Sequence, residues 1–314
     1  MLGTAALGAA VSLPALAEVP LRIQCSDLSQ AEQRKVVADL KALTGGPRQP
    51  PAERLESGRR WLAGLETPAG EWLELPDGPR VRVLQARSPR GALLQLHGGG
   101  WCLGAATSGE EQLARLSLAT GLTVVSVDYR LAPEHPFPAG PEDCLKAARW
   151  LLESELGAGK LYLRGSSAGA HLAVSTLVGL GAKAARFAGA VLYYGVYDLA
   201  GTPSRLLAAD EDHPDLAPTS MEEYTRWFLP TGTDRRRGDV SPLYARLEDL
   251  PPALMLVGTQ DILLDDSLFL AARWGAAGSE VDLVIYPNAP HGFDGYPTEM
   301  ARDAQAREVA FLKA

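Results

Sequence analysis

Three residues of the chain, Ser167, Asp261 and His291, have the side chains of a serine nucleophile with its base and its acid. A serine hydroxyl is a weak nucleophile at neutral pH unless a neighbouring base removes its proton. A neutral imidazole suits that task, and a carboxylate can hold the imidazole in the correct tautomer and stabilise the imidazolium ion. The three groups can cooperate only where the fold brings them within hydrogen-bond reach of one another.

The pentapeptide 165–169, Gly-Ser-Ser-Ala-Gly, has Ser167 at its centre. It follows a short apolar run at 161–163 and opens a segment of helical character at 168–180. A Gly-x-Ser-x-Gly turn between a strand and a helix is a nucleophile elbow, which lifts the serine hydroxyl clear of the sheet. A side chain at either glycine would collide with the neighbouring strand or helix. Because the chain holds 32 glycines, the pentapeptide alone is weak evidence.

The elements around the elbow predict an α/β fold. Strand signals occur eight times, and most of those after residue 91 are continuous apolar runs, as expected for parallel strands that are buried on both faces. The predicted strands are 71–75, 81–86, 92–96, 122–127, 161–163, 189–194, 253–257 and 281–286. The predicted helices are 110–120, 142–156, 168–180 and 267–277. This alternation predicts a mostly parallel eight-stranded sheet covered by helices on both faces, with an antiparallel hairpin at its start.

The acid and the histidine each follow a predicted strand. Ligands of open α/β sheets bind outside the carboxyl ends of the strands, and Asp261 and His291 fall at two of those ends. The chain order of serine, acid, histidine is that of α/β hydrolases rather than of chymotrypsin or subtilisin. Asp265 and Asp266 are alternative acids, but carboxylates at the start of a helix also favour its N-terminal dipole. His171, one turn after the serine, is interpreted as a packed residue.

A glycine-rich loop, residues 97–101 (His-Gly-Gly-Gly-Trp), follows the predicted strand 92–96. Successive glycines let backbone N–H groups point at one ligand oxygen, and the N–H of Ala168 after the nucleophile adds another donor. This arrangement predicts an oxyanion hole. The alternative, a phosphate-binding loop, lacks the Gly-Lys-Ser/Thr of a Walker motif and the G-x-G-x-x-G of a dinucleotide-binding turn.

Further strings make the sequence resemble the hormone-sensitive-lipase-like bacterial esterases of the α/β-hydrolase superfamily. They are residues 97–100, 128–139, 165–169, 241–243 and 291–293, together with Asp261 and Asp265. The resemblance covers roughly residue 75 to the C-terminus. It implies a serine carboxylesterase with an oxyanion hole at Gly98, Gly99 and Ala168, and with His97 and Glu134 as residues that support the loop. Two departures are Ser166, where the family commonly has Asp or Thr, and Ile262, where it has Pro.

The resemblance also implies small, short-acyl ester substrates. The serine mechanism itself needs no metal or organic cofactor. Four aromatic residues could narrow the pocket or could equally belong to the core: Trp101, Phe137, Tyr194 and Tyr197. Alternatives with the same triad are an amidase, a formamidase or a carbohydrate acetyl esterase. A non-catalytic ligand receptor, as among the plant gibberellin receptors, would lack the triad histidine, and His291 argues against it.

Composition excludes several other classes of function. A formal charge of −8 and a pI near 5.3 argue against nucleic acid or an anionic membrane as a partner, because both require a basic surface. The three cysteines, Cys25, Cys102 and Cys144, lack metal-type spacing and predict free, mostly buried thiols. His213 lies among acidic residues at 210–215, which we interpret as a solvated loop rather than a metal site. We expect a monomer or a homodimer.

The N-terminal third predicts accessory segments. Residues 1–17 are an uncharged stretch that ends in Ala-Leu-Ala, which favours an export signal and a periplasmic or secreted protein. The missing basic region leaves an apolar cap helix as the alternative. Residues 18–68 predict a small helical cap, residues 69–314 the catalytic domain, and residues 202–250 a possible second part of the cap. No apolar run in the catalytic domain is long enough to cross a membrane.

Overall fold

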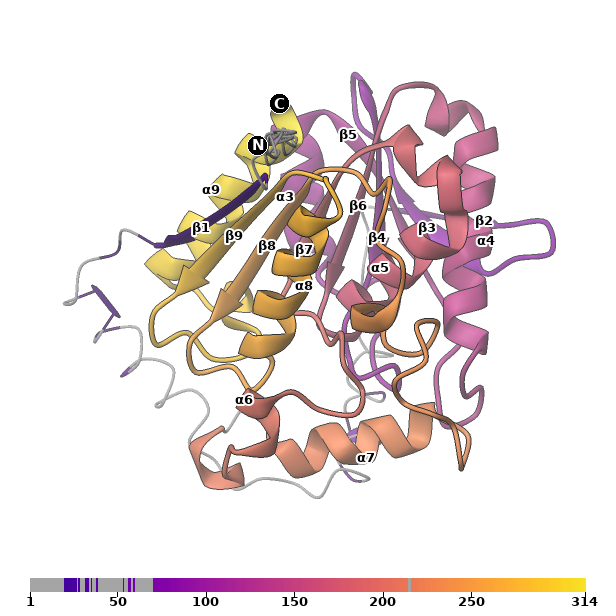
Figure 1. Cartoon of the computed structure of the whole chain (residues 1–314). Coiled ribbons are helices and arrows are strands. Elements are labelled where there is room, and N and C mark those ends of the chain that lie inside the picture. Colours follow the sequence, from indigo (N-terminus) through magenta and orange to yellow (C-terminus); the bar gives the residue numbers. More distant parts are fainter. Residues whose placement is uncertain are drawn as a thin grey trace, which may run out of the picture.

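The computed structural model describes residues 20–26, 28, 32–33, 35, 38, 53, 56–57, 59, 70–213 and 216–314. Its centre is a nine-stranded sheet with the order β1-β9-β8-β7-β6-β4-β5-β3-β2 (Figure 1). From β1 to β5 in this order all neighbouring strands are parallel, while β3 and β2 continue the sheet in antiparallel pairing. The strands are Leu21–Cys25 (β1), Glu71–Glu74 (β2), Arg80–Leu84 (β3), Gly91–Leu96 (β4), Leu122–Val127 (β5), Lys160–Ser166 (β6), Phe187–Tyr193 (β7), Ala253–Gly258 (β8) and Val281–Tyr286 (β9).

The predicted α/β-hydrolase sheet is confirmed, but it has nine strands rather than eight. The additional strand is β1, inside the segment 18–68 that the sequence predicts as helical. It pairs in parallel with β9, from Leu21 opposite Val281 to Cys25 opposite Ile285. Its short apolar–polar alternation suits an edge strand, whose backbone completes the open edge of β9 while most of its side chains stay exposed. The rest of the predicted cap lies mostly outside the described residues, as do residues 1–17.

Helices cover both faces of the sheet. Figure 1 shows α3 and α9 on one face and α4, α5 and α8 on the other. The α-helices are Glu110–Thr120 (α3), Ala139–Glu153 (α4), Ala168–Leu180 (α5), Pro203–Leu206 (α6), Pro218–Phe228 (α7), Leu264–Ala276 (α8) and Glu299–Lys313 (α9). Short 3-10 helices are Glu155–Ala158 (η1), Gly181–Arg186 (η2), Asp210–Asp212 (η3), Pro242–Tyr244 (η4) and Phe293–Gly295 (η5).

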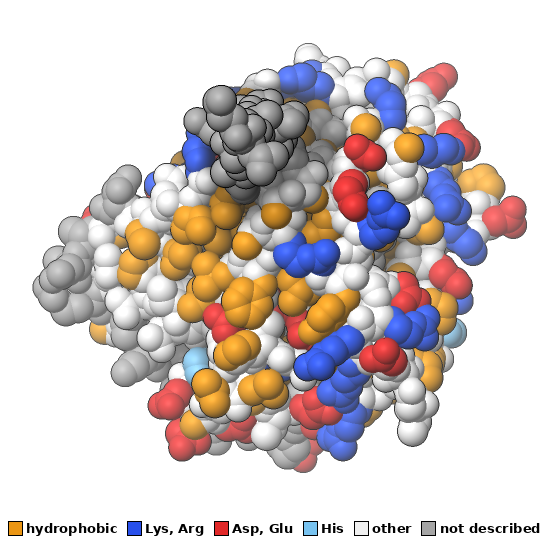
Figure 2. Space-filling model, viewed as in Figure 1, with side chains coloured by type: hydrophobic (Ala, Val, Ile, Leu, Met, Phe, Trp, Pro, Cys, Tyr) orange, Lys and Arg blue, Asp and Glu red, His pale blue; other side chains and the backbone are white. Residues whose placement is uncertain are grey.

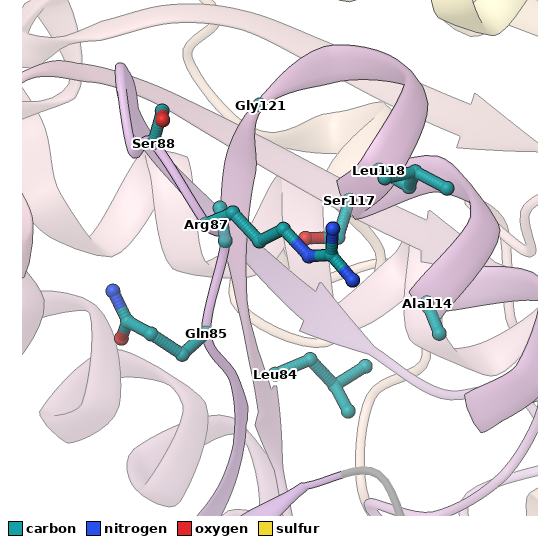
Figure 3. A pocket seen from close by; sticks show the side chains of 9 residues that line it. Leu84, Gln85, Arg87, Ser88, Ala114, Ser117, Leu118 and Gly121 are labelled. Carbon is teal, nitrogen blue, oxygen red and sulfur yellow. The ribbon is translucent and has the colours of Figure 1, made fainter.

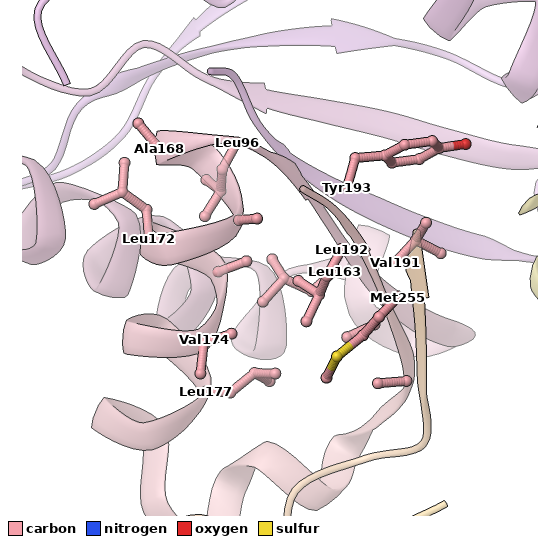
Figure 4. Packing of buried hydrophobic residues seen from close by; sticks show 14 of the residues in the cluster. Leu96, Leu163, Ala168, Leu172, Val174, Leu177, Val191, Leu192, Tyr193 and Met255 are labelled. Carbon is pink, nitrogen blue, oxygen red and sulfur yellow. The ribbon is translucent and has the colours of Figure 1, made fainter. Parts of the chain in front are cut away.

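The core explains why the inner strands are apolar without interruption. Every residue of β4, β5 and β8 is buried, because helices pack on both sides of these strands. Figure 4 shows one such layer, in which Leu172, Val174 and Leu177 of α5 lie over strand residues that include Leu163 and Met255. This packing fixes α5, and therefore the turn that precedes it, against the middle of the sheet.

The excursion between β7 and β8 carries α6 and α7 below the carboxyl ends of the strands (Figure 1). Phe228 at the end of α7 stacks on Trp101 with ring centroids 4.5 Å apart, and its carbonyl accepts the Phe137 N–H at 2.7 Å. The segment 202–250 therefore contacts the loop that follows β4. Whether it acts as a second part of the cap stays a prediction.

On the face of the molecule seen in Figure 2, apolar side chains gather across the left and centre, whereas Lys and Arg lie beside Asp and Glu mainly at the right and along the lower edge. Within the described ranges, none of the helices combines the length and the apolar character needed to cross a membrane. Cys102 and Cys144 are buried free thiols, as predicted, whereas Cys25 in the edge strand is exposed.

Candidate active site

The three predicted chemical groups meet at the carboxyl ends of β6, β8 and β9. His291 Nε2 lies 2.9 Å from Ser167 Oγ, and His291 Nδ1 lies 2.9 Å from Asp261 Oδ2. The Asp261 side chain is fully buried, whereas 14% of the His291 side chain is exposed. Because the carboxylate can only accept, Nδ1 carries the proton and Nε2 is left to accept from the serine hydroxyl. The arrangement has the geometry of a nucleophile, a base and an orienting acid.

The turn at Ser167 has the strain and the close packing of a nucleophile elbow. Ser167 has φ 54° and ψ −124°, and its N–H donates to the Tyr193 carbonyl at 2.9 Å. A Cβ at Gly165 would lie 2.3 Å from the Gly169 carbonyl oxygen, and one at Gly169 would lie 2.1 Å from the Leu96 carbonyl oxygen. Both contacts are impossible, so strand and helix can approach this closely only with glycine at the two positions.

The glycine loop (residues 97–101) lies against this elbow. A Cβ on Gly98 would stand 2.9 Å from the Ser166 carbonyl oxygen and 3.4 Å from Ser167 Cβ. Gly99 has φ 116°, and its carbonyl accepts the Leu103 N–H at 2.8 Å, which closes the loop into a turn. In the described part of the structure, the N–H groups of Gly98, Gly99 and Ala168 donate no hydrogen bond. They are therefore available to an oxygen beside Ser167.

His97 supports the glycine loop from within the core. Tyr129 stacks on the His97 ring at 4.1 Å, and its hydroxyl donates to the His97 carbonyl at 2.7 Å. His97 Nδ1 lies 2.8 Å from the Gly98 carbonyl oxygen. Burial lowers the pKa of His97 to about 4, so the ring stays neutral near physiological pH. These contacts fix the start of the loop without adding a charge to it.

Glu134 is linked to Cys102, the residue after the glycine loop, through an arginine that the sequence does not single out. Its carboxylate binds Arg59, with Nη1 at 2.7 Å and Nη2 at 2.9 Å. Arg59 also donates to the Cys102 carbonyl at 3.1 Å and to the Ala132 carbonyl at 2.8 Å. One arginine in an accessory segment gives no sequence signal, because its partners are carbonyls of residues far along the chain.

His171 connects the glycine loop to α5 as a packed, uncharged residue. Its side chain is fully buried, its Nδ1 accepts the indole N–H of Trp101 at 3.0 Å, and its Nε2 donates to the Val240 carbonyl at 2.8 Å. Burial lowers the pKa of His171 from 6.5 to about 4. The interpretation of His171 as structural is thus supported, and its structural task is to hold Trp101.

This lowered pKa predicts a pH dependence of stability. The unfolded chain binds a proton at His171 below about pH 6.5 and the folded chain only near pH 4, so the contribution of His171 to stability is present above pH 6.5 and is lost as the pH falls toward 4. Replacing His171 with Gln, which can still accept from Trp101 and donate to Val240, should make the loss of unfolding free energy between pH 7.5 and pH 5 smaller by about 2 kcal/mol. Urea titrations at the two pH values measure this difference. An unchanged difference in His171→Gln would contradict the prediction.

The four predicted pocket aromatics differ in their surroundings. Trp101 and Tyr197 are 1% and 0% exposed, so both belong to the core in this structure. Phe137 is partly exposed and packs edge-on against Phe228 at 5.7 Å. Tyr194 is 6% exposed, and its ring contacts the imidazole of His291. Of the four, Tyr194 contacts the triad histidine, and Phe137 is partly exposed.

The alternative acids have other partners. Asp266 is fully buried and accepts the backbone N–H groups of Tyr197 and Asp198, at 2.6 and 2.8 Å, and the Thr202 hydroxyl at 2.6 Å. Burial raises the pKa of Asp266 to about 6. Asp265 accepts the Ser204 N–H at 2.8 Å. In contrast, Asp261 accepts from His291 and, through its other oxygen, from the Leu263 N–H at 2.9 Å.

Two other features lie apart from the triad. A surface hollow of about 540 Å³ is lined by residues that include Leu84, Arg87, Ser117 and Leu118 (Figure 3). It also includes Gly121 immediately before β5, at the opposite end of the parallel strands from Ser167. Among the described residues, no group of three or more His, Cys, Asp and Glu side chains is arranged to hold a metal ion.

Sequence comparisons find relatives over most of the chain. Residues 93–295 match a family model described as the alpha/beta hydrolase fold. The chain is 34% identical over 252 residues to an acetyl-hydrolase of Streptomyces hygroscopicus, which covers 79% of this chain and 83% of that protein. It is 31% identical over 306 residues to Esterase LipI of Mycobacterium tuberculosis, covering 91% and 88% of the two chains.

Solved structures show the same similarity. A crystal structure of a hormone-sensitive lipase from a metagenome library superposes with a TM-score of 0.77 at 27% sequence identity. The superposition covers 90% of this chain and 97% of that one. The similarity in structure therefore extends over most of this chain.

Proposed function

Since this chain belongs to the hormone-sensitive-lipase-like esterases of the α/β-hydrolase superfamily and is a carboxylic-ester hydrolase, we propose that it cleaves its substrate through an acyl-enzyme formed on Ser167. The observation that carries the proposal is the unbroken chain of two 2.9 Å contacts from Ser167 Oγ through His291 to Asp261. A hydroxyl in this arrangement can lose its proton to the imidazole as it attacks a carbonyl carbon.

In the first half-reaction, His291 Nε2 takes the proton of Ser167 as Oγ bonds to the ester carbonyl carbon. The buried carboxylate of Asp261 stabilises the resulting imidazolium. The tetrahedral intermediate then collapses, the carbon–oxygen bond to the alcohol breaks, and His291 gives its proton to the leaving alcohol. In the second half-reaction His291 activates a water molecule, which releases the acid and restores the serine hydroxyl.

The negative charge of each tetrahedral intermediate would be held by the N–H groups of Gly98, Gly99 and Ala168. Support comes from their position beside Ser167 and from the absence of another acceptor for them among the described residues. The donors are fixed before the reaction by the turn at Gly99 and by the start of α5. Donors that need no reorganisation stabilise developing charge most effectively.

We further propose that the substrates are small esters with short acyl groups. The similarity to a protein named acetyl-hydrolase supports this class. A series of p-nitrophenyl esters of increasing acyl length measures the preference directly.

A fluorophosphonate probe tests the acyl-enzyme step. The activated Ser167 oxygen should displace fluoride from phosphorus, so the intact mass should rise by one phosphonyl group, with the adduct on the peptide that contains Ser167. Heat-denatured protein is the control and should not react, because the base is no longer in place. A folded, active protein that stays unlabelled, or one labelled at another residue, would contradict the proposal.

A further inference from the structure

Tyr194 occupies an unusual backbone position next to the catalytic histidine. It follows β7 with φ 36°, in the left-handed region that bulky side chains rarely adopt. Its N–H donates to the Leu256 carbonyl of β8 at 2.7 Å, which holds the backbone there. Ser167 and Trp101 also have positive φ, and each follows a strand that ends at the same site. Strain of this kind persists where a side chain must be placed accurately.

The strained backbone directs the Tyr194 ring onto the imidazole of His291. The two ring centroids are 4.6 Å apart and the planes cross at 62°. The two hydrogen-bond partners of the imidazole, Ser167 and Asp261, hold only its two nitrogens. An edge-to-face contact restricts rotation of the ring about its side-chain bonds. The phenol ring therefore limits the orientations in which Nε2 can face the serine.

The hydroxyl of Tyr194 is bonded to the same loop that carries the histidine. It donates to Asp294 Oδ1, three residues after His291 and within η5. Asp294 is 6% exposed, and its carbonyl accepts from Gln305 of α9 at 3.2 Å. One side chain thus contacts the imidazole through its ring and the histidine loop through its oxygen.

Asp294 is part of a buried ion cluster formed with Arg164 and Glu308. Arg164 Nη2 lies 3.8 Å from Asp294 Oδ2, and Arg164 Nε lies 2.6 Å from Glu308 Oε1. Arg164 precedes Ser167 by three residues on β6, so the cluster links the nucleophile strand to the histidine loop. Buried ions persist only where hydrogen bonds satisfy their remaining atoms, and Tyr194 supplies one of these bonds to Asp294.

We propose that Tyr194 is a positioning residue that fixes the rotation of the His291 imidazole between Ser167 and Asp261. The inference rests on the proposed function of His291 as the base. It concerns the orientation of the base and not the binding of substrate. The consequence is that loss of the ring should lower kcat and leave KM almost unchanged.

Two variants at this position separate the ring from the hydroxyl. Tyr194→Leu removes the ring contact and should lower kcat for p-nitrophenyl acetate about 10- to 100-fold, because small misplacements of a catalytic group cost this much. Its rate of reaction with a fluorophosphonate should fall by the same factor, since that reaction needs the same base. Tyr194→Phe keeps the ring and loses only the bond to Asp294, so its kcat should lie between those of Tyr194→Leu and the wild type.

Tyr193→Phe is the matched control. The Tyr193 hydroxyl donates to a buried carboxylate of the same ion cluster, Glu308, at 2.8 Å. Its ring points away from the layer packed under α5, as Figure 4 shows, and packs on Arg164 at 5.0 Å. Tyr193→Phe and Tyr194→Phe should therefore lower the melting temperature by similar amounts, while only the latter lowers kcat.

Three results would each overturn the inference. Tyr194→Leu keeps kcat within about twofold of wild type, or Tyr194→Leu loses activity through a higher KM and not a lower kcat. The third is a Tyr193→Phe variant that loses as much kcat as Tyr194→Phe. Where Tyr194→Leu does not fold, the comparison of the two phenylalanine variants decides. A wild-type protein that fails to react with the probe refutes the proposed function as well. A reactive wild type with an equally reactive Tyr194→Leu refutes the positioning role alone.

Discussion

Replacing Ser167 with alanine is expected to lower kcat/KM for p-nitrophenyl acetate by about 10⁴- to 10⁶-fold. The reason is that the nucleophile and its base act as one unit, so His291 has nothing left to activate except water. The described partner of Ser167 Oγ is His291, and the backbone bond from the Ser167 N–H to the Tyr193 carbonyl does not involve the side chain. The variant should therefore fold with a melting temperature close to that of the wild type. An end-point assay of p-nitrophenyl acetate hydrolysis at high enzyme concentration measures the residual rate of the variant.

The neighbouring serine gives a matched control for this substitution. Ser166 belongs to the same turn, but its Oγ lies beside Gly98 and not beside His291. Ser166→Ala should therefore keep activity within about tenfold of wild type, a change that would reflect only a small shift of the glycine loop. A Ser167→Ala protein with more than about one per cent of wild-type activity would contradict the assignment of the nucleophile.

Replacing Asp261 with asparagine should lower kcat about 10⁴-fold while KM changes little. One oxygen of Asp261 accepts the Leu263 N–H at 2.9 Å, so the amide oxygen of an asparagine must take that place. Its NH₂ group then faces His291 Nδ1, which has to become an acceptor. The imidazole proton moves to Nε2, and the nitrogen that faces Ser167 can no longer accept a proton. A pH-controlled kcat measurement on the folded variant records the loss.

Asp265→Asn is the control for the acid. Asp265 lies at the start of α8 and accepts the Ser204 N–H. Among the described residues it makes no hydrogen bond to His291. The variant should therefore keep kcat within about threefold of wild type. A large loss in Asp265→Asn together with a mild effect in Asp261→Asn would reverse the assignment. The two aspartates are only four residues apart, so both substitutions remove a negative charge near the start of α8. Only Asp261→Asn should also change the tautomer of His291. Comparing the two kcat values therefore separates tautomer selection from a general loss of charge.

Much of the fold follows from local features of the sequence. The continuous apolar runs at 92–96, 122–127 and 253–257 fall within β4, β5 and β8, because a strand buried on both faces has no polar positions to offer. The glycines at 165 and 169 indicate a strand and a helix in close approach, and the structure has that approach. The strand at 21–25 gives no comparable signal, because an exposed edge strand requires only backbone pairing and carries a weak pattern.

The candidate site likewise has features that the sequence predicts and features that it does not. The sequence alone placed a serine, an acid and a histidine after three apolar runs, and the rule that ligands bind at the carboxyl ends of parallel strands made their meeting predictable. The supporting contacts were not predictable. Arg59, the Tyr194 hydroxyl and the ion cluster of Arg164, Asp294 and Glu308 join residues that are far apart in the chain. Nothing in their spacing indicates this.

The predictable and the unpredictable features differ because local interactions determine the former and long-range packing determines the latter. Glycine requirements, apolar periodicity and chain order act over a few residues, so the sequence by itself determined the class of fold and the identity of the three chemical groups. Which of several aromatic residues lines a pocket, packs in the core or contacts the histidine depends on the packing of segments from the whole chain. Only the tertiary structure placed Trp101 and Tyr197 in the core and the Tyr194 ring on His291.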